Sequence, residues 1–258
     1  MSQTAPMSFR VSAEAYDRFI GRYSVLLAPW MASFAKVAGD QRVLDVGCGP
    51  GALTTELVRR LGSAAVTAVD PSEQFVRAAR ERLPGVKVER ASAERLPFPD
   101  RSFDAVMAQL VVHFMADPVA GLAEMARVTR SQGIVAACVW DHSGSQGPLG
   151  AFWEAARVLD PEVEDESDLA GAREGHLEEL FEAAGLQKIE ATLFSVSVEH
   201  PTFKEWWEPF TLGVGPAGSY TAGLDPNRQA RLRDLCRERF PDEPFVVTAR
   251  AWAARGLA

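Results

Sequence analysis

The sequence is poor in cysteine and histidine, and it contains no long run of apolar residues. Its three cysteines, Cys48, Cys138 and Cys236, are far apart and form no CxxC pair, which argues against a disulfide framework or a zinc knuckle. No two of its 4 histidines have metal-ligand spacing, so we expect no metal. No apolar run approaches the roughly 20 residues that span a bilayer, and residues 1–10 lack the apolar stretch of a signal peptide. These absences predict a cytoplasmic protein that does not engage a membrane.

The sequence also has fewer basic than acidic residues. The chain has 27 Lys and Arg against 35 Asp and Glu, a formal net charge of −8. This is the wrong sign for a protein that works by neutralising phosphates, so we expect no nucleic-acid partner. The 258 residues are 47% hydrophobic, with 20 Gly and 16 Pro, which is typical of a chain that folds around a large core rather than of a low-complexity chain. The oligomeric state is left open.

Strand and helix patterns alternate about five times across residues 42–140, which predicts an α/β fold with an open, mostly parallel sheet and helices on both faces. After residue 141 the regular alternation of strand and helix patterns ends. The patterns there predict a helix at 174–184, an alternating strand at 189–195, helices that begin at Thr202 and Asp225, and a final strand at 245–249. We therefore expect a single domain with a helical cover at 1–40, a cofactor-binding core at 41–140, and an acceptor-side region at 141–258 with a helical insertion at about 200–243.

A glycine turn joins the first strand pattern, 43–46, to the helix that follows it. Backbone N–H groups and the helix dipole at such a turn can hold a negatively charged group of a ligand. The spacing of Gly47, Gly49 and Ala52 also satisfies the GxGxxA fingerprint of dinucleotide-binding proteins, and Asp70 lies near the position of a ribose-binding acid. Two cofactors are compatible with this turn, a dinucleotide and S-adenosylmethionine. Asp45 discriminates between them, because its carboxylate would repel the pyrophosphate of a dinucleotide and attract the ammonium group of S-adenosylmethionine. The charge argument favours S-adenosylmethionine.

Five segments, in order, resemble the motifs of class I S-adenosylmethionine-dependent methyltransferases. The resemblance extends over about residues 14–140 and implies a Rossmann-like fold with a seven-stranded sheet. The segments are Val43–Gly51, Ala68–Ser72, Ala91–Phe98, Phe103–Val106 with Gln109, and Glu124–Val128 with Gly133.

The resemblance also implies roles for individual residues. Asp70 would accept both ribose hydroxyls, although a helix N-cap is the competing interpretation of this residue. An N-terminal helix would cover the cofactor, with Tyr16 or Tyr23 at its methionine group, although these side chains and Phe19 could instead pack on the sheet. The remaining expected contacts are Asp45, Gly47, Cys48, Gly49 and Gly51 at the methionine end, Pro71 and Ser72 beside the ribose, Ser92, Ala93 and Glu94 beside the adenine, and Gln109 and Leu110 at the sulfonium.

Two histidines follow predicted strands at the edge of the sheet where ligands bind. His113 and His142 are therefore candidates for a general base, the alternative being a hydrogen-bonded histidine near a loop. We expect His176 and His200 to be surface residues. Trp206 and Trp207 cannot share one helix face, so one should face the cleft and the other the core. The expected acceptor-binding residues are Trp140, Asp141, Trp206, Trp207 and Phe210.

These observations predict a methyltransferase that moves the methyl group of S-adenosylmethionine to a small acceptor, leaving S-adenosylhomocysteine. The acidic charge and the aromatic residues late in the chain favour an apolar or aromatic metabolite. Two alternatives remain, an NAD(P)-dependent oxidoreductase and a non-catalytic cofactor-binding protein of the same fold. The residues do not decide whether oxygen, nitrogen, sulfur or carbon is methylated, nor whether a base takes part.

Overall fold

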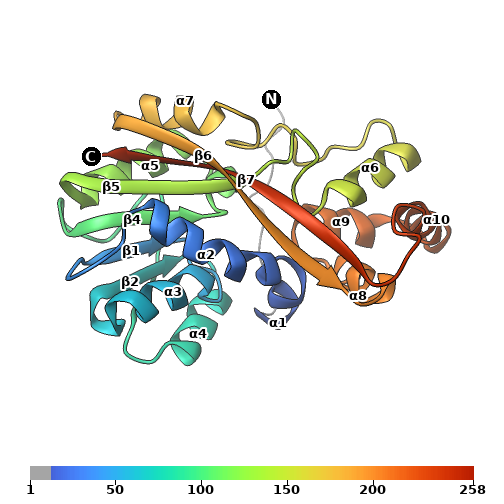
Figure 1. The fold of residues 1–258 in the computed structure, drawn as a ribbon, viewed down its shortest axis with the longest axis horizontal. Helices are drawn as coiled ribbons and strands as arrows, with labels where there is room; N and C mark the ends of the chain where they lie inside the picture. The colour runs from blue at the N-terminus through green and yellow to red at the C-terminus, as the bar shows by residue number, and fades with distance from the viewer. Residues whose placement is uncertain (1–12) are drawn as a thin grey trace.

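Seven strands form one sheet in the computed structural model, which describes residues 13–258 (Figure 1). The strand order is β3-β2-β1-β4-β5-β7-β6; the first five strands pair in parallel, whereas β7 is antiparallel to both β5 and β6. The predicted Rossmann-like, mostly parallel sheet is confirmed. The strands are β1 (Val43–Val46), β2 (Val66–Asp70), β3 (Lys87–Arg90), β4 (Phe103–Gln109), β5 (Thr129–Trp140), β6 (Gln187–His200) and β7 (Phe245–Leu257).

Helices connect the parallel strands and begin where the sequence signals predicted. Helix α3 (Ala52–Leu61) follows the glycine turn, and α4 (Glu73–Arg82) follows β2. Helix α5 (Pro118–Val128) has Asp117 as its N-cap, with the carboxylate accepting a hydrogen bond from the Ala120 N–H. Because each βα turn lies at the carboxyl end of a strand, the turns after β1, β2 and β4 gather at one edge of the sheet.

Two apolar layers cover the sheet. On one face α2 (Arg22–Phe34) and α3 bury Leu27, Met31 and Leu57, and on the other α5 and α7 (His176–Ala183) bury Leu122 and Phe181. Both layers contact strands that are themselves buried, which explains why β1 and most of β4 are apolar. None of the helices within residues 13–258 is long and apolar enough to cross a membrane.

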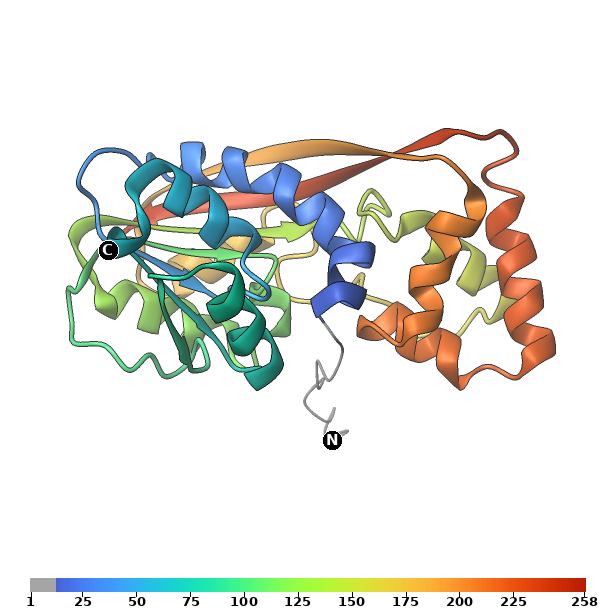
Figure 2. The same ribbon diagram turned by 90° about the horizontal axis from the view of Figure 1, so that it is seen from below.

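Strands β6 and β7 continue beyond the rest of the sheet and carry a helical lobe at their far end (Figures 1 and 2). The pairing of β5 with β7 ends at Trp140 and Ala251, whereas β6 and β7 stay paired as far as His200 and Phe245. The late helical insertion is confirmed, but both strands are longer than predicted, and α6 lies in a stretch for which no helix was predicted. The lobe consists of α6 (Gly150–Leu159), α8 (Phe203–Trp207), the short 3-10 helix η4 (Glu208–Leu212), α9 (Gly215–Gly223) and α10 (Pro226–Arg237).

The N-terminal helix lies between the sheet and the lobe (Figure 2). It starts as α1 (Ala13–Tyr16), passes through a π-helical turn, η1 (Asp17–Gly21), and continues as α2. Asp17 forms an ion pair of 2.5 Å with Arg82 of α4, and Arg18 forms one of 3.2 Å with Glu208 of the lobe. The helix therefore joins the two parts of the molecule. The first part of the predicted cover, residues 1–12, lies outside the described residues.

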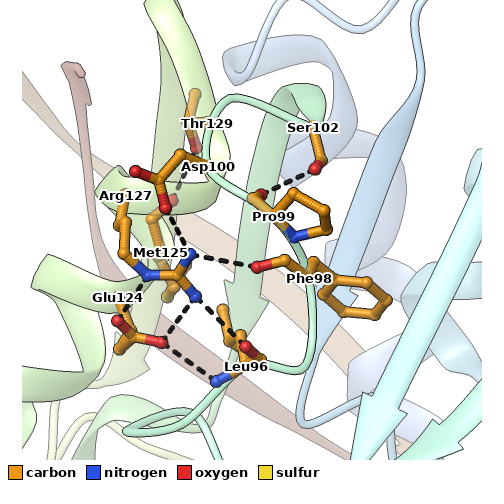
Figure 3. A network of polar contacts seen from close by, with 9 residues as sticks. All are labelled: Leu96, Phe98, Pro99, Asp100, Ser102, Glu124, Met125, Arg127 and Thr129. Carbon is orange, nitrogen blue, oxygen red and sulfur yellow. Dashed lines mark hydrogen bonds and ion pairs between the residues drawn. The ribbon is translucent and has the colours of Figure 1, made fainter.

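A polar cluster around Arg127, here called the Arg127 clamp, fastens the loop before β4 to α5 (Figure 3). The guanidinium donates to Glu124 at 2.7 and 2.9 Å, to Asp100 at 2.6 Å, and to the carbonyls of Phe98 and Leu96. Glu124 also accepts the Leu96 N–H at 3.1 Å. These bonds raise the pKa of Arg127 and lower that of Glu124. The clamp thus joins residues 96–100 to α5, two segments that are separated in the sequence.

Candidate functional site

A cavity of about 420 Å³ opens at the carboxyl edge of β1, β2 and β4. Its wall combines the glycine turn, the end of β2 and the end of β4. Of the residues predicted to bind a cofactor, it is lined by Tyr16, Gly47, Gly49, Asp70, Pro71, Ser72, Gln109 and Leu110. A smaller adjoining cavity of about 110 Å³ is lined by Tyr16, Asp45, Gly47, Cys48, Gly51 and Gln109. The structure thus brings together most of the predicted cofactor contacts, from segments distant in sequence.

The glycine turn needs glycine for space as well as for conformation. Gly47 has φ +69°, and a Cβ at this position would lie 2.4 Å from the Val111 side chain. Gly49 has φ +53° and turns its N–H toward β2, where it donates to Asp70 Oδ2 at 2.8 Å. The turn is therefore tied to the neighbouring strand at the mouth of the cavity.

Asp70 organises the turn with both of its carboxylate oxygens. Oδ1 accepts the Ser72 N–H at 2.8 Å, while Oδ2 accepts the Gly49 N–H. Burial raises the pKa of Asp70 to about 6, although these two hydrogen bonds oppose the shift. Ser72, and not Asp70, is the N-cap of α4, since its hydroxyl accepts the Phe75 N–H. The interpretation of Asp70 as a helix cap is therefore wrong.

Asp45 is a second buried carboxylate near the turn, with 1% of its surface exposed. Thr54 Oγ1 of α3 donates to Asp45 Oδ2 at 2.6 Å. Burial raises the pKa of Asp45 to about 7, and the hydrogen bond from Thr54 opposes the shift. Thr54 was absent from the predicted site. Its position in the first turn of the helix after the glycines is the signal that could have identified it.

Gln109 lines both cavities. Its Nε2 donates to the Ser24 carbonyl at 2.9 Å, which fixes the orientation of the amide because a carbonyl can only accept. Gln109 Oε1 is buried and has no hydrogen-bond partner within residues 13–258. The next residue, Leu110, has a left-handed backbone with φ +62°, which is uncommon for leucine and often marks a functional site.

The two tyrosines of the N-terminal helix have different surroundings. Tyr16 lines both cofactor-side cavities and packs edge-on against Phe75 at 5.5 Å, and burial raises its pKa to about 12. Tyr23 is buried against Trp140, and its hydroxyl lies 3.0 Å from His200 Nε2. His200 is only 3% exposed, so the prediction of a surface histidine is wrong there. His176 is half-buried and accepts the Gly171 N–H through Nδ1.

The segment predicted beside the adenine does not reach the wall of the 420 Å³ cavity. Ser92 is exposed, and Ala93 is buried under α5. Glu94 accepts the Ala116 N–H at 2.8 Å, an interaction that holds the segment after β4. Arg90 and Phe114 line this side of the cavity instead. An adenine contact from residues 92–94 stays a prediction.

A third cavity, of about 40 Å³, lies on the other side of Leu110 and Tyr16 and is called here the inner cavity. Both candidate bases line it. The His113 and His142 rings lie 5.8 Å apart between centroids, and burial lowers the pKa of each, His113 well below its ordinary value. Trp140 and the buried Glu166 complete the polar part of the wall. Glu166, which no sequence signal distinguished, accepts the Trp153 Nε1–H at 2.9 Å.

The other predicted acceptor residues do not line the inner cavity. Asp141 accepts the Gly144 N–H at 2.8 Å and so stabilises the turn after β5. Trp206, Trp207 and Phe210 are all buried in the aromatic cluster of the lobe, where Phe210 stacks on Phe152 at 4.5 Å. The expectation that one of the two tryptophans would face a cleft and the other the core is wrong, because both pack in this cluster. The lobe lines the inner cavity with Leu149, Val214, Gly215 and Pro216. Within residues 13–258, no three His, Cys, Asp or Glu side chains are grouped as metal ligands.

The sheet order, the glycine turn and the two buried carboxylates define an open α/β fold with its ligand site at the carboxyl edge of the parallel strands. Residues 44–137 match the family model described as a methyltransferase domain. The fold and this match agree with the predicted class I S-adenosylmethionine-dependent methyltransferase domain over residues 44–137.

Similar proteins found by sequence comparison are also named as methyltransferases. An uncharacterized methyltransferase of Mycobacterium tuberculosis is 36% identical over 127 residues, 49% of each chain. A demethylmenaquinone methyltransferase of Tropheryma whipplei is 36% identical over 140 residues, 52% of this chain and 58% of its own. The chain spans about half the length of the curated relatives it matches. A solved geranyl diphosphate methyltransferase in complex with S-adenosylmethionine shares the fold, with a TM-score of 0.54 and 14% identity over 92% of this chain and 87% of its own.

Proposed function

We propose that this protein transfers the methyl group of S-adenosylmethionine to a small apolar or aromatic acceptor. The observation that carries the proposal is the polar set on the cofactor-side cavities. Asp45 and the unpartnered Gln109 Oε1 offer two acceptors at one end, and Asp70 lies across the glycine turn. A volume of about 420 Å³ also falls within the roughly 300–1,000 Å³ that is usual for small-ligand sites.

The polar set fits S-adenosylmethionine group by group. An ammonium group carries donors and positive charge, which suit Asp45 and Gln109 Oε1. Each Asp70 oxygen already accepts one backbone N–H and keeps a lone pair for a ribose hydroxyl. A pyrophosphate in the same place would meet two buried carboxylates, which disfavours a dinucleotide. Bound S-adenosylmethionine supplies a methyl group already activated by its sulfonium.

The residues of this chain then need mainly to align the acceptor. Leu110 and Tyr16 line both the cofactor-side cavity and the inner cavity, so an acceptor held in the inner cavity would adjoin the cofactor. Alignment of this kind can lower a barrier by about 7–11 kcal/mol. His113, neutral in its buried position, would take up the proton that a protic acceptor loses. The name of the Tropheryma whipplei relative is compatible with a small apolar acceptor.

Calorimetric titration with S-adenosylhomocysteine and with NADH tests the proposal. We expect binding of S-adenosylhomocysteine and a loss of at least tenfold in affinity for Asp70→Ala, because each charge-assisted hydrogen bond contributes about 1.5–3 kcal/mol. Asp104→Ala is the matched control, since Asp104 also accepts a backbone N–H, from Arg42, but lies at the opposite end of β4. Its affinity should match that of the wild type.

Two results would contradict the proposal. Preferential binding of NADH by the wild type would identify an oxidoreductase. Tight binding of S-adenosylhomocysteine without methylated products, in an incubation with S-adenosylmethionine and a metabolite extract followed by mass spectrometry, would identify a non-catalytic binding protein. An unchanged affinity in Asp70→Ala would remove the ribose role alone.

A further inference from the structure

Three buried polar atoms without hydrogen-bond partners belong to residues that line the inner cavity. They are His113 Nδ1, His142 Nε2 and Trp140 Nε1, and none has a partner within residues 13–258. Buried polar groups are almost always paired, and each unmade bond costs about 1–3 kcal/mol. Three such atoms on residues that line one cavity therefore point to a ligand that pairs with them.

The chemistry of these atoms restricts the ligand. Burial lowers the pKa of both histidines, so each ring is neutral and carries one N–H donor and one acceptor nitrogen. The indole N–H of Trp140 can only donate. A carboxylate only accepts hydrogen bonds and an ammonium only donates them, whereas a hydroxyl does both. A hydroxyl can therefore donate to one histidine while it accepts from the other ring or from the indole.

The rest of the wall disfavours an anionic acceptor. Among the described residues that line this cavity there is no lysine or arginine, so an anion placed there would have no counter-charge. The carboxylate of Glu166, 3% exposed, is part of the same wall and would repel an anion. The remaining side chains are mainly apolar, with Phe19, Phe114 and Leu149 among them. The surroundings therefore suit an uncharged, apolar body.

From this arrangement we infer that the acceptor is an uncharged molecule whose reactive hydroxyl, borne on an apolar ring, lies between His113 and His142 with Trp140 as a further donor. The inference rests on the proposed function and specifies its substrate class: oxygen is methylated, and carboxylic acids and amines are excluded. When the oxygen gains the methyl group, its O–H bond breaks, the electron pair stays on oxygen, and the proton moves to the accepting histidine nitrogen. The C–S electron pair leaves with the sulfur.

Fluorine NMR on the protein saturated with S-adenosylhomocysteine tests this inference. Three probes of similar size differ in one group: 4-fluorophenol, 4-fluorobenzoate and 4-fluorobenzylamine. Titration of each, followed through its line width, gives a dissociation constant even for weak binding. We expect 4-fluorophenol to bind at least tenfold more tightly than either charged probe, a difference of about 1.4 kcal/mol.

Variants test whether the preference arises from the named atoms. His113→Phe and His142→Phe should each remove most of it, and His176→Gln, a histidine outside the cavity, should keep it. Trp140→Phe deletes the indole N–H with little change in shape, so a weaker preference there supports the inference even if a histidine variant does not fold.

Tighter or equal binding of 4-fluorobenzoate or 4-fluorobenzylamine would overturn the inference, and so would the absence of binding by all three probes. A preference that survives in both histidine variants would also overturn it. Calorimetry on the same sample separates these results from a failure of the proposed function, because that failure would appear as a loss of S-adenosylhomocysteine binding itself.

Discussion

The Arg127 clamp and the inner cavity are both polar clusters, but their hydrogen bonding differs. In the clamp every nitrogen of the guanidinium has an oxygen partner, and Glu124 accepts from both Arg127 and the Leu96 N–H. In the inner cavity His113, His142 and Trp140 each leave a buried atom without a partner among the described residues. A polar cluster whose bonds are complete stabilises the fold, whereas open bonds on buried atoms are rare, and here we attribute them to a ligand site.

The largest effect should follow substitution in the inner cavity. His113→Gln should lower the single-turnover rate of methyl transfer by about 10²–10⁴ while leaving the affinity for S-adenosylhomocysteine unchanged. Because burial lowers the pKa of His113 well below 6.5, wild-type turnover should stay level down to that pH and decline only in more acidic solution. Rapid-quench kinetics across a pH series measures both quantities. A wild-type rate in the variant, with the same acidic limb, would eliminate His113 as the base.

An intermediate effect, on stability alone, should follow substitution in the clamp. Arg127→Met should lower the free energy of unfolding by about 1–3 kcal/mol, because Glu124 and two carbonyls lose a charged donor that is about one-third exposed. Thermal denaturation should show a melting temperature lower by a few degrees. Arg228→Met, which removes an exposed ion pair with Asp160, is the control and should cost about 0–1 kcal/mol. A loss of S-adenosylhomocysteine affinity in Arg127→Met would show that the clamp also shapes the site.

The smallest effect concerns Asp45, whose carboxylate accepts a hydrogen bond from the Thr54 hydroxyl. Its hydrogen bonding is therefore intermediate between the complete Arg127 clamp and the open inner cavity. Its pKa of about 7 means that acid protonates the carboxyl and removes its attraction for an ammonium group. Calorimetry from pH 8 to pH 6.5 should show affinity for S-adenosylhomocysteine falling by up to about tenfold per pH unit. Asp45→Asn should bind more weakly at pH 8 and lose this dependence. An equally steep dependence in the variant would contradict the assignment.

The same carboxyl should affect stability with the opposite sign. Its folded pKa lies above the ordinary value of 3.8, so the folded state binds a proton that the unfolded state has released between about pH 4 and pH 7. Stability of the ligand-free protein should therefore fall as the pH rises through this range. Asp45→Asn, which carries no charge, should be more stable than the wild type at pH 8 in a denaturant titration.

The parts of the fold that the sequence predicted are those specified locally. The glycines after β1, the Asp117 cap of α5 and the capping box at Thr202 each determine structure within a few residues, and the structure has a turn or helix at all three. The alternation of strand and helix then gave the parallel sheet, because connections of this kind are right-handed and short.

Long-range packing accounts for what the sequence did not predict. The Tyr23 hydroxyl meets His200 across a sequence separation of 177 residues, which explains how an apparently ordinary polar residue becomes buried. Trp206 and Trp207 differ in helix face, but α8 has neighbours on both sides and buries them both. Glu166 lines a cavity in the folded chain, where Trp153 of α6 donates a hydrogen bond to it. None of these contacts leaves a local pattern.

The long pairing of β6 and β7 has a mechanical consequence. Between Ala251 and Phe245, strand β7 forms strand pairs with β6 alone, so a ribbon of two strands joins α8 and α10 of the lobe to the sheet. A two-stranded ribbon is more strongly twisted than a full sheet, and we expect this twist to set the position of the lobe relative to Leu110. The lobe also contacts the N-terminal helix, through the ion pairs of Arg18 with Glu208 and of Arg22 with Glu205 and through the packing of Phe19 against Phe210. Added salt should weaken the ion pairs and leave the strand pairing and the ring packing unchanged, so we expect ionic strength to alter only part of the contact between the lobe and the helix.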